Sequence, residues 1–199
     1  MNKSLIKSLA FLTMITTLSV SSLIVARADD TGMTTGGIQI QTYVSSIDEH
    51  DASKRADFKN GKTYVPSNNI AYRVEVRNVK SESWIRLKFS MKADGINPDD
   101  SWLQGIDTSK WKKYPDGYWY YNKKVGTGER IEFCDSIKIP DHISVGKDTE
   151  VDIVYRAEAI QAAHVSPNFN SSKPFDGFEI ESTNGVYEGH DKIKGFNIV

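Results

Sequence analysis

The residues of this 199-residue chain that could do chemistry are few and scattered. The four histidines show no H-E-x-x-H or His-x-His spacing; they are His50, His142, His164 and His190. Metal binding needs side chains that converge on one point, so we expect surface histidines and no metal site. Neither a G-x-S-x-G nucleophile elbow nor a phosphate-binding G-x-x-x-x-G-K-[ST] loop occurs. The pattern predicts a protein that is not an enzyme and has no cofactor.

Two further groups of residues carry an assignable chemistry. The run Asp48 to Asp51 (DEHD) offers oxygen ligands for weak Ca²⁺ binding, but it lacks the spacing of an EF-hand loop, which favours a solvated loop. Cys134 is the single cysteine, so no disulfide can form within the chain. Because free cysteines are often buried, a buried thiol is the favoured interpretation. The neighbouring Asp135 also disfavours a reactive thiolate. A disulfide between two chains stays open as the alternative.

The N-terminus has the features of a secretory signal peptide. Lys3 and Lys7 precede an apolar segment, residues 9–25, and Ala26-Arg27-Ala28 forms an A-x-A site before Asp29. We expect signal peptidase to cleave after Ala28, with an uncleaved membrane anchor as the alternative. The leader holds three of the 25 basic residues and none of the 26 acidic ones, which gives the mature chain a net charge of −4. A secreted, mildly acidic chain without a stable anchor is predicted, and nucleic-acid binding is not expected.

The elements that would have to position any site are almost all strands. Alternation of apolar and polar residues with period two marks residues 38–44, 70–77, 85–92 and 151–160. Shorter strands are predicted at 118–125, 131–134 and 136–139, with a short helix at 101–105 and an optional edge strand at 193–199. About eight to ten short strands with little helix predict an all-β fold. We expect a jelly-roll-like antiparallel β-sandwich with short helical turns in its loops.

Four regions follow from these patterns. Residues 1–28 are the signal peptide, and residues 29–37 are a flexible, glycine-containing lead-in. Residues 38–165 form the sandwich domain. Residues 166–199, rich in Pro, Asn, Ser and Gly, are predicted to be a loop-rich C-terminal extension.

The most aromatic stretch of the chain is Trp111 to Val125 (WKKYPDGYWYYNKKV). Proline presets φ and glycine accepts a positive φ, so Pro115-Asp116-Gly117 is predicted to turn the chain between two extended arms. Aromatic residues occupy both faces of the second arm. Either both faces are covered, or an exposed aromatic row that includes Trp119 and Tyr121 serves as a contact surface.

Four motifs follow one another between residues 64 and 165. They are Val76-Arg77-Asn78 with Trp84 to Lys88 (WIRLK), Asp116 to Val125 with Gly128-Glu129, Ile137 to Pro140 (IKIP), and Ala157 to Ala162 (AEAIQA). In this order they resemble segments of the TasA/camelysin-type exported proteins of Gram-positive bacteria. The chain departs from that family after the leader, where Ala28-Asp29-Asp30-Thr31 replaces the usual aromatic start.

The resemblance implies a jelly-roll domain that acts in cell-surface fibres or in a biofilm matrix. In such fibres the N-terminal segment can leave its own subunit and complete a sheet of the next one. The donor strand here would be residues 38–44, whose inward side chains are expected to be Ile38, Ile40, Thr42 and Val44. Addition of this kind does not close on itself and yields filaments. Whether the strand packs at home or in a neighbour stays open.

Three functions compete. The first is a structural subunit that associates with itself or with another exported fibre protein. The second is a monomeric surface adhesin that grips a partner or glycan through Trp119 and Tyr121. The third, a camelysin-like metallopeptidase, is disfavoured because no zinc-ligand spacing is present.

Overall fold

The computed structural model describes residues 37–47, 53–59, 69–93, 95–140, 150–180 and 182–194. The predicted signal peptide, with its cleavage residues Ala26, Ala28 and Asp29, lies outside the described residues. The same holds for most of the lead-in and for the acidic run Asp48 to Asp51. Within the described ranges, no helix has the length and apolar character needed to cross a membrane.

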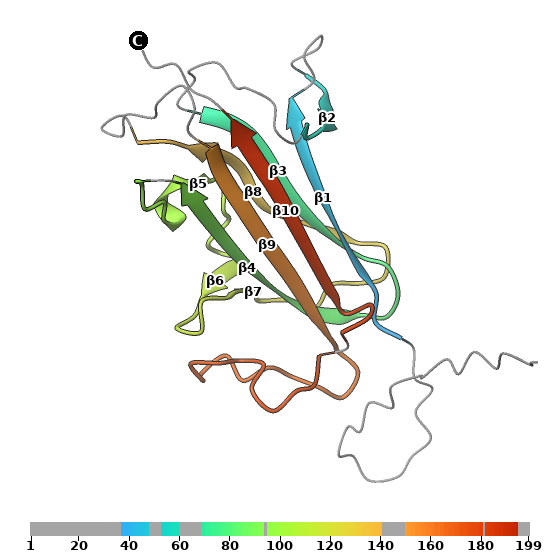
Figure 1. Ribbon diagram of the computed structural model, residues 1–199. Helices are drawn as coiled ribbons and strands as arrows, with labels where there is room; N and C mark the ends of the chain where they lie inside the picture. Colours follow the sequence, from blue (N-terminus) through green and yellow to red (C-terminus); the bar gives the residue numbers. More distant parts are fainter. Residues whose placement is uncertain are drawn as a thin grey trace, which may run out of the picture.

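Two antiparallel sheets of five strands, which we call sheet A and sheet B, pack face to face (Figure 1). In hydrogen-bonding order, sheet A contains β2 (Arg55–Asp57), β1 (Ile40–Ile47), β3 (Asn69–Asn78), β8 (Arg130–Lys138) and β5 (Leu103–Gln104). Sheet B contains β10 (Val186–Lys194), β9 (Glu150–Gln161), β4 (Ser83–Ala93), β7 (Trp119–Tyr121) and β6 (Trp111–Lys113). This arrangement confirms the predicted all-β, jelly-roll-like sandwich.

The alternation in the sequence decides which side chains fill the space between the sheets. Every second side chain of β3 and of β4 is buried, in phase with the apolar residues. Aromatic rings close the part of the core near the hairpin. The Trp111 ring packs edge-on against Tyr121 and Phe133, with centroids 5.1 and 5.2 Å apart. Such edge-to-face pairs contribute about 0.5–1.5 kcal/mol beyond the burial of their area.

The aromatic stretch forms the predicted hairpin of β6 and β7. Gly117 has a φ of 83°, and its N–H donates to the Tyr114 carbonyl at 3.0 Å. The Asp116 carboxylate accepts the N–H of Tyr118 at 3.1 Å, which fixes the turn. The second strand is shorter than the predicted 118–125 and ends at Tyr121.

One strand stands where two were predicted. Residues 131–134 and 136–138 belong to β8, which continues through Asp135, and Ile139 follows its end. The pairing of β8 with β3 shifts register near Val74. An extra residue at a bulge changes the phase of the inward side chains, so Phe133 and Cys134 are both buried. In the sequence, this break in the apolar alternation looks like the end of a strand, which is why two strands were predicted.

The C-terminal strand begins earlier than predicted, since β10 spans Val186–Lys194. Of the edge strand predicted at 193–199, the structure describes only residues 193 and 194. Strand β10 pairs with β9 at nine positions, so this part of the predicted loop-rich extension is a sheet strand. Gly189 and the charged residues of this segment interrupt the apolar alternation that marks a strand, so the sequence did not predict β10 here. Gly189 is required because a Cβ there would lie 2.0 Å from Cζ of Tyr155.

The helix predicted at 101–105 is a single 3₁₀ turn, η1 (Asp100–Trp102), followed directly by β5. Asp99 caps the turn by accepting the N–H of Ser101 at 2.8 Å. The turn brings Trp102, which is 2% exposed, into the core.

Candidate functional site

Strand β1 and the two residues before it contain the predicted donor strand, residues 38–44. Ile38, Ile40 and Thr42 point into the core, with exposed fractions of 2%, 4% and 7%, and Val44 is half-buried. In this single chain the strand therefore packs at home. Its partner over residues 40–45 is β3, in antiparallel register from Ile40 opposite Asn78 to Ser45 opposite Arg73.

The other edge of β1 is only partly covered. Strand β2 pairs with Ser45, Ser46 and Ile47, and no strand among the described residues pairs with 40–44 on that side. Two single backbone hydrogen bonds add to this pairing: Ile40 N–H donates to the Asn184 carbonyl at 3.0 Å, and Phe58 N–H donates to the Val44 carbonyl at 3.1 Å. Strand β1 thus lies near the border of sheet A, held firmly on one side and lightly on the other.

One polar atom on the buried face of β1 has no hydrogen-bond partner among the described residues. The Thr42 hydroxyl is buried, and no group in the described part of the chain hydrogen-bonds to it. A buried hydroxyl without a hydrogen bond costs about 1–3 kcal/mol. This cost reduces the free energy with which β1 packs in its own subunit.

The proposed aromatic contact surface is not an exposed pair. Tyr121 is 8% exposed and packs on Trp111, so the prediction was wrong for this residue. Trp119 is half-buried, and its ring lies 5.8 Å from that of Phe133. The physical reason is the pleat of β7: residues 119 and 121 share the face that points between the sheets.

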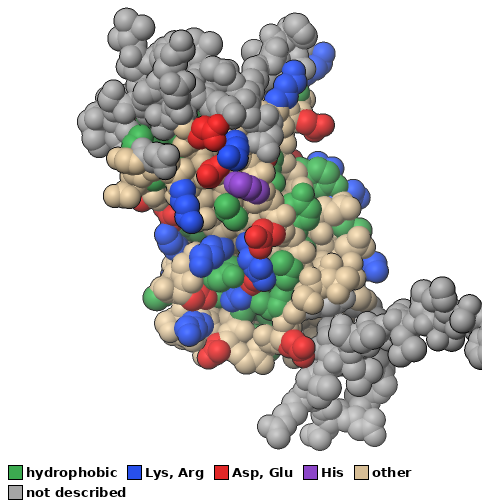
Figure 2. All heavy atoms as spheres, in the orientation of Figure 1, with side chains coloured by type: hydrophobic (Ala, Val, Ile, Leu, Met, Phe, Trp, Pro, Cys, Tyr) green, Lys and Arg blue, Asp and Glu red, His purple; other side chains and the backbone are tan. Residues whose placement is uncertain are grey.

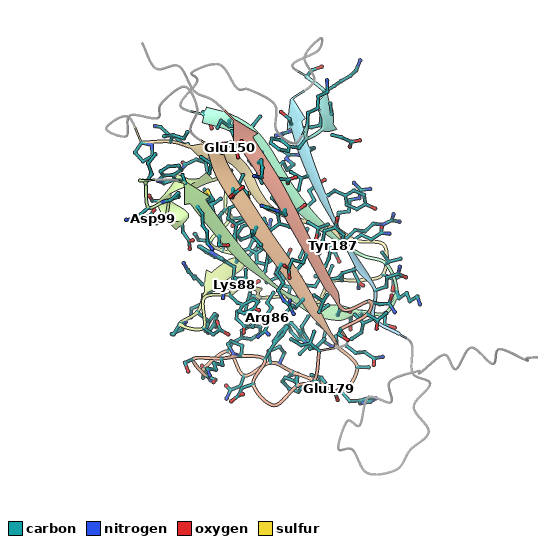
Figure 3. All side chains as sticks on the ribbon, in the orientation of Figure 1. Arg86, Lys88, Asp99, Glu150, Glu179 and Tyr187 are labelled. Carbon is teal, nitrogen blue, oxygen red and sulfur yellow. The ribbon has the colours of Figure 1, made fainter. Side chains whose placement is uncertain are left out.

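The opposite face of the hairpin meets a polar cluster. Arg86 of β4 donates to the Glu158 carboxylate of β9 at 2.7 Å and to the Tyr120 hydroxyl at 2.9 Å. The Tyr120 hydroxyl donates in turn to Asp116 at 2.5 Å. The guanidinium lies 4.0 Å from the centroid of the Tyr118 ring, a cation–π contact. Figure 3 places Arg86 at the end of sheet B that adjoins the loop of residues 163–180.

Glu158 is the most deeply buried charge of this cluster, with a side chain 3% exposed. It accepts hydrogen bonds from Arg86, from Arg156 at 2.5 Å and from the Tyr118 hydroxyl at 3.2 Å. Burial alone raises the pKa of Glu158, but the hydrogen bonds from Arg156 and Arg86 outweigh it and lower the pKa below its usual value. The carboxylate is therefore ionised and paired at neutral pH.

The loop of residues 163–180 covers the cluster from outside. Phe175, 3% exposed, places its ring 5.0 Å from the Arg86 guanidinium carbon. The loop is tied down where Trp84 Nε1–H donates to the Val165 carbonyl at 2.9 Å and the Tyr114 hydroxyl donates to the Phe169 carbonyl at 3.0 Å. The rings of Tyr118, Tyr120 and Phe175 all lie against the Arg86 guanidinium, which occupies the space between them. The cluster therefore joins sheet B to the loop. Sheet B is covered on both faces here, as one of the two interpretations predicted.

Sequence reasoning did not bring these residues together, although they belong to three of the four motifs. Arg86 stands in WIRLK, Asp116 to Tyr120 in the hairpin motif, and Glu158 in AEAIQA. The available signal was a glutamate inside an otherwise apolar strand end, because a buried carboxylate needs a cationic partner. Nothing in the sequence names that partner.

No protein-family model, curated protein or solved structure matches this chain. The family resemblance therefore stays an expectation that rests on the motifs. The geometry of β1 and of the polar cluster is what a functional proposal can be built on.

The remaining reactive groups of the described residues are Cys134, His164 and His190. Burial raises the pKa of the Cys134 thiol to about 12, so it is a buried, neutral thiol as expected. His164 and His190 are exposed, and within the described ranges no group of three His, Cys, Asp or Glu side chains converges. Acidic and basic side chains are interspersed over the face seen in Figure 2.

Proposed function

We propose that this chain is a secreted, non-enzymatic structural protein, a subunit or accessory component of cell-surface fibres or of a biofilm matrix. Its partners are further copies of itself or another exported fibre protein. The observation that carries the proposal is the position of β1. It is the first strand of the sandwich, it pairs at length with β3 alone, and its other edge is uncovered by any described strand over residues 40–44.

Donation of β1 is physically reasonable because its departure leaves a gap in the sandwich that the same strand of another subunit can fill. Its departure frees the backbone of β3 from Arg73 to Asn78 and opens the space filled by Ile38, Ile40 and Thr42. The same strand from a second copy restores both the hydrogen bonds and the buried area. Because each subunit then donates one strand and accepts another, the assembly grows head to tail into a filament.

The adhesin hypothesis needs Trp119 and Tyr121 as an exposed pair, and they are not one, so we do not propose it. Tyr121 is in the core and Trp119 packs on Phe133. Substituting either residue would disturb folding before it disturbed a contact surface.

A reversible disulfide between β1 and β3 tests the proposal. Gln41 and Arg77 are opposite each other in register, within the Cα separation that a disulfide accepts. We expect the Gln41→Cys/Arg77→Cys variant of the mature chain, residues 29–199, to form no filaments when oxidised and to regain them when reduced. Electron microscopy after concentration and mild acidification is the measurement.

The matched control joins two strands that do not move in the proposed exchange. Ser90 and Val154 are opposite each other on β4 and β9, and Ser90→Cys/Val154→Cys should assemble in both redox states. Filaments from the oxidised Gln41–Arg77 variant would refute donation of β1. A wild-type chain that stays monomeric under every condition would refute the fibre function itself.

A further inference from the structure

The segment that pairs with the second half of β1 has an unusual construction. Strand β2 contains no buried residue, since Arg55 and Asp57 are exposed and Ala56 is half-buried. Three residue pairs are too few to hold a strand without a fully buried side chain. Its attachment must come from the residues around it.

Phe58 provides the first fastening. Its ring meets the buried Tyr72 ring edge-on, with centroids 4.8 Å apart, and it packs against the core cluster. Its N–H donates to the Val44 carbonyl, so the same residue anchors both the core and β1. Phe58 therefore pins the segment over the end of β1.

Arg55 provides the second fastening. Its guanidinium pairs with Asp135 of β8, across the two intervening strands β1 and β3 of sheet A. Asp135 also accepts from Arg73 of β3 at 3.0 Å. Burial raises the pKa of Asp135, and the hydrogen bonds from Arg73 and Arg55 outweigh it and lower the pKa. The carboxylate is thus charged at neutral pH and joins β2 to the part of the sheet that does not move.

We propose that residues 55–58 form a clasp that holds β1 in its own subunit and must open before β1 can be donated. This inference rests on the proposed function and adds the step that would control the release of β1. The clasp covers the outer edge of β1 over Ser45 to Ile47, where an incoming strand would otherwise add. It reaches across β1 to two anchors, Tyr72 and Asp135, that belong to β3 and β8.

Hydrogen exchange of the monomer, followed strand by strand, tests the clasp without any need for filaments. In Phe58→Ala we expect the amides of residues 40–47 to exchange about tenfold faster or more, with residues 150–161 of β9 unchanged. Arg55→Gln should give about a two- to fivefold increase in the same residues, as suits a partly exposed ion pair. Lys124→Gln removes a similar exposed pair with Glu82, away from the clasp, and should change neither strand.

The outcomes separate the clasp from the fibre function. Unchanged exchange in β1, or equal increases in β1 and β9, would overturn the clasp, because Phe58 would then be an ordinary part of the cooperative core. If the wild type forms filaments, Phe58→Ala should shorten the lag before they appear. If the wild type forms none, the fibre function fails while the exchange result still decides whether the clasp exists.

Discussion

Replacing Thr42 by valine should stabilise the folded chain. The Thr42 hydroxyl is buried on the inner face of β1 and has no hydrogen-bond partner among the described residues. Removing such a group recovers part of a desolvation cost of about 1–3 kcal/mol, and the new methyl group contributes up to about 0.8 kcal/mol. Because β1 lies near the border of the sheet, we expect a net gain of about 1–2 kcal/mol.

Urea unfolding followed by tryptophan fluorescence measures this gain. The midpoint should rise with no change in the slope, since the surface exposed on unfolding stays the same. In a thermal scan the gain corresponds to about 3–6 °C for a domain of this size. Donation of β1 requires its release, so filament formation by Thr42→Val should also slow.

Ser83→Ala is the control of opposite sign. The Ser83 hydroxyl is fully buried as well, but it donates to the Ser81 carbonyl at 2.8 Å, so its loss should cost about 1 kcal/mol. If Thr42→Val lowers the midpoint, the Thr42 hydroxyl has a partner, and the view that β1 is loosely held at home is wrong.

Two further predictions concern the packing of sheet B. Glu158→Gln should destabilise the chain by about 3 kcal/mol in urea, because it removes the nearer of the two carboxylates that pair with the buried Arg86 charge, whereas Glu188→Gln, an exposed partner of Arg156, should cost less than 1 kcal/mol. Since the folded pKa of Glu158 lies below its unfolded value of about 4.3, its contribution is complete above that pH and is lost as the pH falls through the folded pKa; equal acid sensitivity of wild type and Glu158→Gln would contradict this. Gly189→Ala should destabilise strongly because its Cβ would overlap the Tyr155 ring, and adding Tyr155→Ala should remove most of the cost of the glycine substitution; thermal melts that show purely additive effects would refute the overlap.

The strands that follow a plain alternation were predictable because one face of each is buried. Residues 70–76 and 85–91 needed no long-range information, since the pleat sorts apolar from polar side chains. The bulge in β8 and the need for glycine in β10 could not be predicted from the sequence, because each depends on contacts with a partner strand. Gly189 weakens a strand pattern until Tyr155 is known to lie across it.

The candidate site was predictable only in part. The inward face of β1, with Ile38, Ile40 and Thr42, follows from local alternation. The hairpin shows the limit: its residues alternate between two faces, but the register of Trp119 opposite Leu87 decides which face is inside. The pairing of Arg86 with Glu158 joins residues 72 positions apart, a separation at which local patterns carry no signal.

The direction in which the chain enters and leaves the sandwich has a mechanical consequence. Ile40 at the start of β1 bonds to Asn184 just before β10, so both strands begin at the same end of the molecule and β10 ends at the other (Figure 1). At the usual rise of a strand, β10 is about 25 Å long. Tension applied where the chain enters β1 and where it leaves β10 therefore runs along the strands. The six residue pairs between β1 and β3 are then loaded together in shear and not peeled apart one after another. A chain of such subunits would resist stretching far better than it would resist the slow, unloaded departure of one strand.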